Sequence, residues 1–97
     1  MFEKMKQLMD MQKKMQEIKR QLDAATFEVA SSDGLVKVTM TAAQEVREVA
    51  VSGDIQQLDK TNLEKAIKDV YNRAVKRAQD IAAQKMKDVT GFNLPGL

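Results

Sequence analysis

The chain has 97 residues, with 16 Lys and Arg against 14 Asp and Glu, and a formal net charge of +2. This length fits one domain, and so small a positive surplus does not by itself identify a nucleic-acid-binding protein. Cys and His are both absent, which excludes disulfides, thiolate nucleophiles, metal sites built on either residue, and the commonest general base. No apolar run approaches the roughly 18 residues of a membrane span and the first residues lack a signal-peptide core, so we expect a cytoplasmic protein.

Residues 1–25 are predicted to form a helix, because they contain no Gly or Pro and few β-branched residues. Apolar residues recur at alternating steps of three and four, at Leu8, Met11, Met15, Ile18, Leu22 and Ala25. Such spacing is the seam of a heptad and indicates a helix that packs along one side. The five Met residues within 1–15 favour flexible core or dimer packing, with an adaptable protein-binding surface as the alternative.

A sheet is predicted over residues 26–52, where the apolar period changes to two. Three strands are marked by Phe27 and Val29, by Val36, Val38 and Met40, and by Val46, Val49 and Val51. Asp33-Gly34 is a strong turn signal, and the link 41–44 lacks Gly, which favours a loop longer than a tight primed turn. Val46 is an odd number of residues from Val49 and Val51, so in a regular strand it would face the opposite side of the sheet. We therefore expect a bulge or a late strand start.

A second helix is predicted over residues 61–90, followed by a tail at 91–97. Thr61 and Glu64 have the spacing of a capping box, and Asp59 is the competing cap. Gly91 is well placed to end the helix, and Pro95 prevents its resumption. Its predicted apolar face, with Tyr71 as a core residue, consists of Leu63, Ile67, Val70, Tyr71, Ala74, Ala78, Ile81 and Val89.

Both predicted helices are longer than the strands that have to cover them. Strands of about five to seven residues span roughly 17–23 Å, whereas these helices span about 35 and 45 Å. The overhanging turns still carry apolar residues, Leu8 and Met11 on one helix and Ile81 and Val89 on the other. We therefore expect a second copy to bury them in a two-fold homodimer.

Charge is distributed unevenly along the sequence. Residues 1–22 carry six basic and three acidic side chains, and residues 55–97 carry eight and five, a net charge of +3 in each segment. Residues 23–54 carry two basic and six acidic side chains, a net charge of −4. The sequence therefore predicts basic helices around an acidic sheet.

Basic residues follow one side of each predicted helix. Lys6, Lys13 and Arg20 are spaced by seven, which places them opposite the apolar seam. On the second helix, Lys65, Lys76 and Lys87 are spaced by eleven and also share one face. A charged side opposite an apolar seam is what any soluble amphipathic helix shows, but cations on projecting helices can also neutralise phosphates. The nine residues that we predict to bind DNA are Lys6, Lys13, Lys14, Lys19, Arg20, Arg73, Lys76, Arg77 and Lys87.

Several strings, taken in order, resemble the YbaB/EbfC family of bacterial nucleoid-associated proteins. They are MFEKMKQLMDMQKKMQEI at the start, DGLVKVTM at residues 33–40, EVREV at 45–49, the helix with Asn72, Ala74 and Lys85-Met86, and the ending TGFNLPGL. The resemblance covers essentially the whole chain. It implies an α+β fold in one domain over 1–97, in the order α-β-β-β-α, forming a tweezer-like homodimer whose helices bind duplex DNA with little or modest sequence preference. It brings no catalytic residue, and nothing in the residues suggests a cofactor or metal.

Two functional hypotheses remain open on the sequence alone. The first is a homodimer that binds double-stranded DNA through its backbone phosphates. The second is a protein-interaction module similar to a prefoldin-like holdase, with the Met-rich first helix as the client surface. Nothing supports catalysis in a chain without His and Cys, so we do not expect an enzyme.

Overall fold

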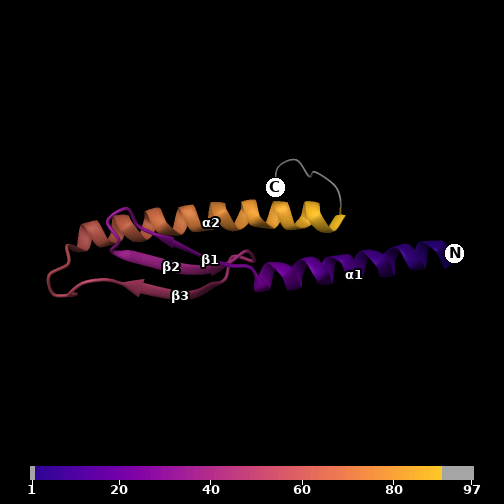
Figure 1. Ribbon diagram of the computed structural model, residues 1–97, viewed down its shortest axis with the longest axis horizontal. Coiled ribbons are helices and arrows are strands. Elements are labelled where there is room, and N and C mark those ends of the chain that lie inside the picture. Colours follow the sequence, from indigo (N-terminus) through magenta and orange to yellow (C-terminus); the bar gives the residue numbers. More distant parts are fainter. Residues whose placement is uncertain (1, 91–97) are drawn as a thin grey trace.

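The computed structural model describes residues 2–90, and its elements follow the predicted order α-β-β-β-α of an α+β fold (Figure 1). The element bounds are α1 Phe2–Ala24, β1 Thr26–Ala30, β2 Val36–Thr41, β3 Val46–Val51 and α2 Lys60–Thr90. Each predicted element is therefore present, with ends close to those expected from the sequence. The predictions for Gly91, Pro95 and the tail at 91–97 lie outside the described residues.

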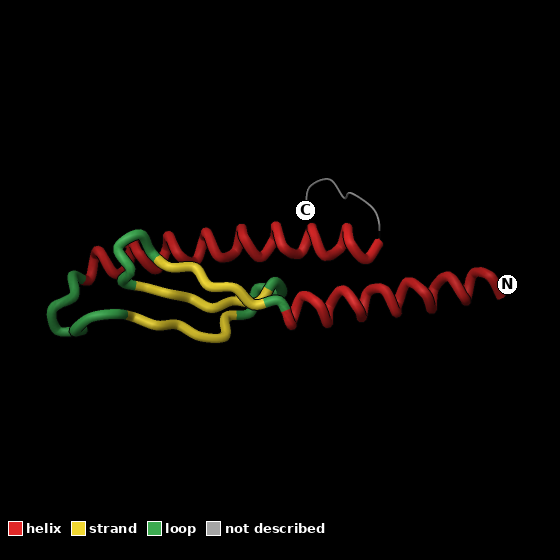
Figure 2. The backbone as a smooth tube through the Cα atoms, in the orientation of Figure 1, coloured by secondary structure: helices red, strands yellow, loops and turns green. Residues whose placement is uncertain are grey.

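The three strands form one antiparallel sheet in the order β1-β2-β3 (Figure 2). Val29 pairs with Val38 and Val38 with Val49, so the apolar residues of all three strands share one face. The register shifts between Thr39 and Met40, where the partner changes from Glu48 to Val46 and Arg47 is passed over. This confirms the bulge expected from the parity of Val46.

Each hairpin has a loop that its residues explain. In the first, Gly34 has φ +74°, and the Ser31 hydroxyl donates a 2.6 Å hydrogen bond to the Asp33 carboxylate. That bond, with one from the Leu35 amide, holds the pKa of Asp33 below its usual value. In the second hairpin the Gln44 amide donates to the Thr41 carbonyl at 2.9 Å and Gln44 has φ +65°, so a four-residue loop over 42–45 replaces a two-residue primed turn.

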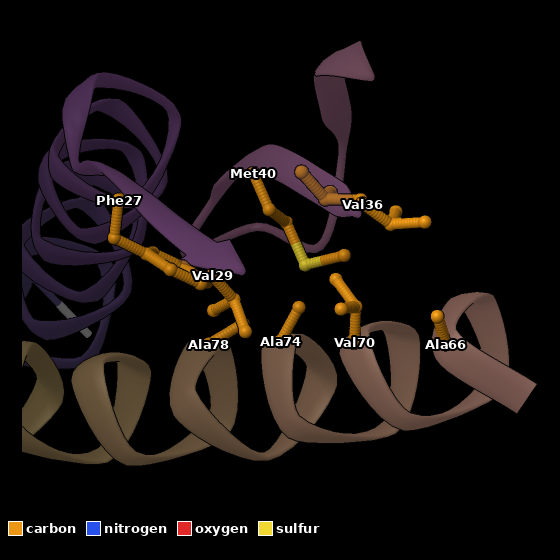
Figure 3. Close-up of a cluster of buried hydrophobic side chains, with 9 residues drawn as sticks. Phe27, Val29, Val36, Met40, Ala66, Val70, Ala74 and Ala78 are labelled. Carbon is orange, nitrogen blue, oxygen red and sulfur yellow. The ribbon is translucent and has the colours of Figure 1, made fainter. Parts of the chain in front are cut away.

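Helix α2 lies across β1 and β2 and forms the core with them (Figure 3). Val70, Ala74 and Ala78 are fully buried against Met40 and its neighbours, because their small side chains allow the helix to approach the sheet closely. The remaining buried members of this core are Phe27, Val29, Val36, Val38 and Ala66. Tyr71 was predicted as a core residue and this is wrong: its side chain is 54% exposed at the margin of the helix–sheet contact.

Helix α2 begins at Lys60, with Asp59 rather than Thr61 as its N-cap. The Asp59 carboxylate accepts a 2.9 Å hydrogen bond from the Thr61 amide, and its carbonyl accepts the first helical bond from Leu63. This is the geometry of a capping residue two positions before its donor. The capping box predicted at Thr61 and Glu64 is therefore wrong, since Thr61 already lies inside the helix.

Helix α1 projects from the rest of the molecule as an arm. Its last turns pack on α2, where Ile18 is buried, but residues 2–16 are exposed throughout. In Figures 1 and 2 the N-terminal end of α1 extends beyond the end of α2. The molecule measures 67 × 23 × 16 Å, and its radius of gyration is 18.3 Å against roughly 13 Å for a compact domain of about 100 residues. Residues Leu8 and Met11 are thus uncovered in the single chain.

Candidate nucleic-acid interface

The clearest basic surface lies along the arm formed by α1. Ile18 is buried and Leu22 is partly buried, so this side of α1 faces α2. Lys6, Lys13 and Arg20 lie about 160° away around the helix at 100° per residue, and all three are exposed. The heptad spacing therefore places one cation every two turns on the side of α1 opposite Ile18 and Leu22.

The arm cations differ in their electrostatic partners. Within the described residues, Lys6 and Lys13 form no ion pair. Arg20 donates from Nε to the Glu17 carboxylate at 3.0 Å, and Gln21 donates to the same carboxylate at 3.0 Å. The hydrogen bond from Arg20 lowers the pKa of Glu17 from 4.5 to about 2 and raises the pKa of Arg20 above its usual value. Part of the Arg20 charge is therefore compensated by its neighbour.

The two arginines predicted on the second helix are held against the sheet. Arg73 Nη2 donates a 2.7 Å hydrogen bond to the Ala30 carbonyl and a 2.8 Å bond to the Asp69 carboxylate. The Arg77 guanidinium lies 5.2 Å from the centre of the Phe27 ring, with Nη1 3.5 Å from the Glu28 carbonyl. Both side chains thus reach the free edge of β1. The sequence does not reveal these contacts, because the residues that form them are more than 40 positions apart.

The other predicted cations remain at the surface. Lys14, Lys19, Lys76 and Lys87 are exposed. Lys6, Lys13, Lys14, Lys19 and Arg20 belong to α1, whereas Arg73, Lys76 and Arg77 belong to the part of α2 that lies over the sheet. The nine predicted residues therefore do not form one continuous patch in a single chain. The arm carries five of these cations, the middle of α2 carries three, and Lys87 lies in the last turn of α2.

Acidic residues lie at the surface of the sheet and its loops. Glu28 on β1 and Glu48 on β3 are exposed, as are Glu45 and Asp54 in the loops that border β3. A polyanion that approaches the chain is consequently attracted by the arm and repelled by the exposed sheet surface. The charge asymmetry of the sequence has a spatial counterpart in the fold.

A sequence profile of the YbaB/EbfC DNA-binding family matches residues 1–93. The chain belongs to this family. The resemblance to this family, inferred from short stretches of the sequence, is thereby confirmed over nearly the whole chain. YbaB/EbfC is a family of DNA-binding, nucleoid-associated proteins. Exposed cations on a projecting helix are consistent with that activity.

A solved structure has the same fold as this member of the YbaB/EbfC family. The uncharacterized protein HP0035 from Helicobacter pylori is 17% identical, and the likeness covers 82% of this chain and 86% of that one with a TM-score of 0.71. At this identity the similarity concerns the fold. Along the described residues, no helix is long and apolar enough to cross a bilayer.

Proposed function

We propose that this YbaB/EbfC protein is a cytoplasmic, nucleoid-associated homodimer that binds duplex DNA mainly through its backbone phosphates. The basic stripe Lys6–Lys13–Arg20 on α1 supplies the principal contacts. Lys14, Lys19, Arg73, Lys76, Arg77 and Lys87 support them. Phosphate contacts release condensed counterions and therefore give affinity with little dependence on base sequence.

The observation that carries this proposal is the position of the stripe on an exposed arm. Lys6 and Lys13 lie on a part of α1 where every described residue from 2 to 16 is exposed, and neither has an ion-pair partner among the described residues. Their long side chains are free to approach a phosphate backbone without breaking an existing contact. Two arms in a homodimer would double the number of cations that contact one duplex.

Uncovered apolar residues on the arm support the homodimer. Leu8, Met11 and Met15 continue the seam of Ile18, but they are 58–62% exposed in a single chain. Monomeric soluble proteins seldom expose large contiguous apolar surfaces, whereas self-associating proteins do. The exposed seam therefore favours a second copy, as the length of the helices predicted.

The test is binding to random-sequence duplex DNA by a variant with Lys6→Gln, Lys13→Gln and Arg20→Gln together. We expect weaker binding and a flatter dependence on salt, because fewer phosphates are neutralised. A matched control removes the same charge elsewhere, with Lys37→Gln, Lys60→Gln and Lys68→Gln, three exposed residues outside the predicted set. Equal losses in both variants would show that net charge, not the arm, governs binding.

A protein-binding module is a second candidate, favoured by the Met-rich surface of the same helix. Met5, Met9, Met11 and Met15 are all more than half exposed, and flexible Met side chains suit apolar clients of varied shape. Salt distinguishes the two candidates. DNA binding through phosphates should weaken steeply between about 50 and 200 mM salt, whereas client capture through apolar contacts should change far less.

A further inference from the structure

Two uncharged side chains alternate with the cations of the basic stripe on α1. Met9 follows Lys6 by three residues and precedes Lys13 by four. Gln16 follows Lys13 by three residues and precedes Arg20 by four. Residues three and four apart are neighbours on the surface of a helix, so each uncharged side chain lies beside two cations. These five residues are all exposed, and together they form the mixed strip of α1.

Acidic residues on α1 determine which flank of the basic stripe is more favourable for DNA. Glu3, Asp10 and Glu17 each precede a cation of the stripe by three residues and border the stripe on one side. Gln16 lies on the other side, about 100–120° around the helix from Asp10 and Glu17. Because carboxylates repel phosphates, a duplex approaches most favourably from the side remote from the acids. That side carries Met9 and Gln16.

The Gln16 side chain is available for an intermolecular contact. It lies about 160° around α1 from the buried Ile18, so it points away from α2. Within the described residues its side-chain amide forms no hydrogen bond. Gln21, by contrast, donates to the Glu17 carboxylate at 3.0 Å. A ligand that binds the Gln16 amide therefore breaks no existing contact in the protein.

We propose that Gln16 recognises adenine in the major groove of the duplex that α1 contacts. An α-helix is about 10–12 Å across and the major groove is about 12 Å wide, so the exposed arm can enter it. There the Gln16 amide N–H donates to adenine N7, and its carbonyl oxygen accepts from the adenine amino group. Lys13 and Arg20, on either side, contact the phosphates that border the groove. This inference rests on the proposed function and adds to it a preference for A·T pairs.

The chemistry of the mixed strip singles out Gln16 for this contact. Lysine and arginine carry hydrogen-bond donors alone, which suit phosphate oxygens, and methionine offers only a weak acceptor. The adenine edge presents one acceptor and one donor, and a carboxamide matches both. Gln7 provides a matched control, because it is exposed too but lies nine residues from Gln16 and hence on the opposite side of α1.

The test compares a duplex of alternating adenine and thymine with the same duplex in which 7-deazaadenine replaces adenine. The modified base pairs normally and keeps every phosphate, but a C–H group replaces N7. The wild type should bind the modified duplex about three- to tenfold more weakly, because each arm loses one hydrogen bond. Gln16→Ala should bind both duplexes equally. Gln7→Ala should discriminate between them as the wild type does.

The dependence on salt separates this contact from the phosphate contacts. Gln16→Ala removes no charge, so its slope of log affinity against log salt should equal that of the wild type. Alanine also favours the helix more than glutamine does, so weaker binding by this variant does not come from a less stable arm.

Each outcome of the comparison supports or overturns the role of Gln16. A wild type that binds both duplexes equally, with a steep salt dependence, would overturn that role and leave the DNA-binding function standing. Discrimination that persists in Gln16→Ala, or that is lost in Gln7→Ala as well, would also overturn it. A wild type that binds neither duplex at low salt would overturn the inference and the proposed function together.

Discussion

Arg73 donates a hydrogen bond of 2.7 Å to the carbonyl oxygen of Ala30, a residue 43 positions earlier in the chain. The same guanidinium binds the Asp69 carboxylate one turn before it on α2. Arg73 therefore connects α2 to the free edge of the sheet. Its guanidinium stabilises the fold in addition to any contact that it makes with DNA.

Replacing Arg73 should affect stability more than replacing an exposed lysine on the same helix. We expect Arg73→Gln to lower the free energy of unfolding by about 1 kcal/mol, the usual net contribution of such a hydrogen bond. Its ion pair with Asp69 adds little, since both side chains are about half exposed. Lys76→Gln, the control, should change stability by less than about 0.5 kcal/mol. Urea unfolding measures both, and equal effects would refute a structural role for Arg73.

Removing Glu17 should strengthen DNA binding by releasing Arg20. We expect Glu17→Gln to increase affinity about two- to threefold at low salt, because Arg20 then faces the phosphates without a competing carboxylate. Glu64→Gln makes the same charge change on α2 and should have a smaller effect. Titration of binding to duplex DNA at about 50 mM salt measures the difference. An unchanged affinity in Glu17→Gln would show that Arg20 does not contact DNA.

The Glu17–Arg20 pair should survive mild acid. The pKa of Glu17 falls from 4.5 to about 2 on folding, so its contribution to stability is present above pH 4.5 and is lost as the pH falls through about 2. The difference in thermal stability between wild type and Glu17→Gln should therefore persist from pH 7 to pH 4.5 and disappear near pH 2. A difference that already vanishes at pH 4.5 would contradict the lowered pKa.

The start of α2 offers a direct test of which residue caps it. Asp59→Ala should lower the free energy of unfolding by about 0.5–2 kcal/mol, because the Thr61 amide loses its acceptor. Thr61→Ala should cost far less, since Thr61 lies inside the helix. Thermal unfolding of the two variants gives the comparison. A larger loss in Thr61→Ala would restore the capping box that the spacing of Thr61 and Glu64 suggested.

Replacing Gln44, in the loop between β2 and β3, by glycine should stabilise the protein. Gln44 has φ +65°, a conformation that is costly for a residue with a Cβ atom. We expect Gln44→Gly to raise the free energy of unfolding by about 0.5–1 kcal/mol, after allowing for the greater freedom of glycine in the unfolded chain. Ala43→Gly, at the preceding position, should instead be destabilising. Urea unfolding distinguishes the two, and a destabilised Gln44→Gly variant would contradict the strain.

The order and type of the elements were predictable because the apolar period changes at Thr26 and again after Gly53. The bulge was predictable for the same reason, since Val46 breaks a period that the sheet has to respect. The N-cap of α2 was not predictable, because Asp59 and Thr61 both present side-chain oxygens at the start of the helix. Only the backbone geometry shows which of them lies outside it.

The candidate site was predictable on α1 and less so on α2. Heptad spacing alone places Lys6 and Lys13 on the side of α1 opposite the apolar seam, and both are exposed in the structure. Helical spacing does not show that Arg73 and Arg77 reach the β1 backbone, because that contact depends on how α2 crosses the sheet. The exposure of Tyr71 and the β3 valines has the same origin: a local apolar pattern does not say how far a helix covers a sheet. The assignment of all nine cations to DNA stays a prediction.

The most direct measurement is the salt dependence of binding to random-sequence duplex, compared between the wild type and the Lys6, Lys13 and Arg20 triple Gln variant. Each phosphate contact contributes about −0.9 to the slope of log affinity against log salt, so losing six arm cations from a dimer should reduce the slope by up to about 5. The account predicts a steep wild-type slope that the triple variant largely removes. A wild type that ignores duplex DNA at low salt, or a variant with an unchanged slope, would contradict it.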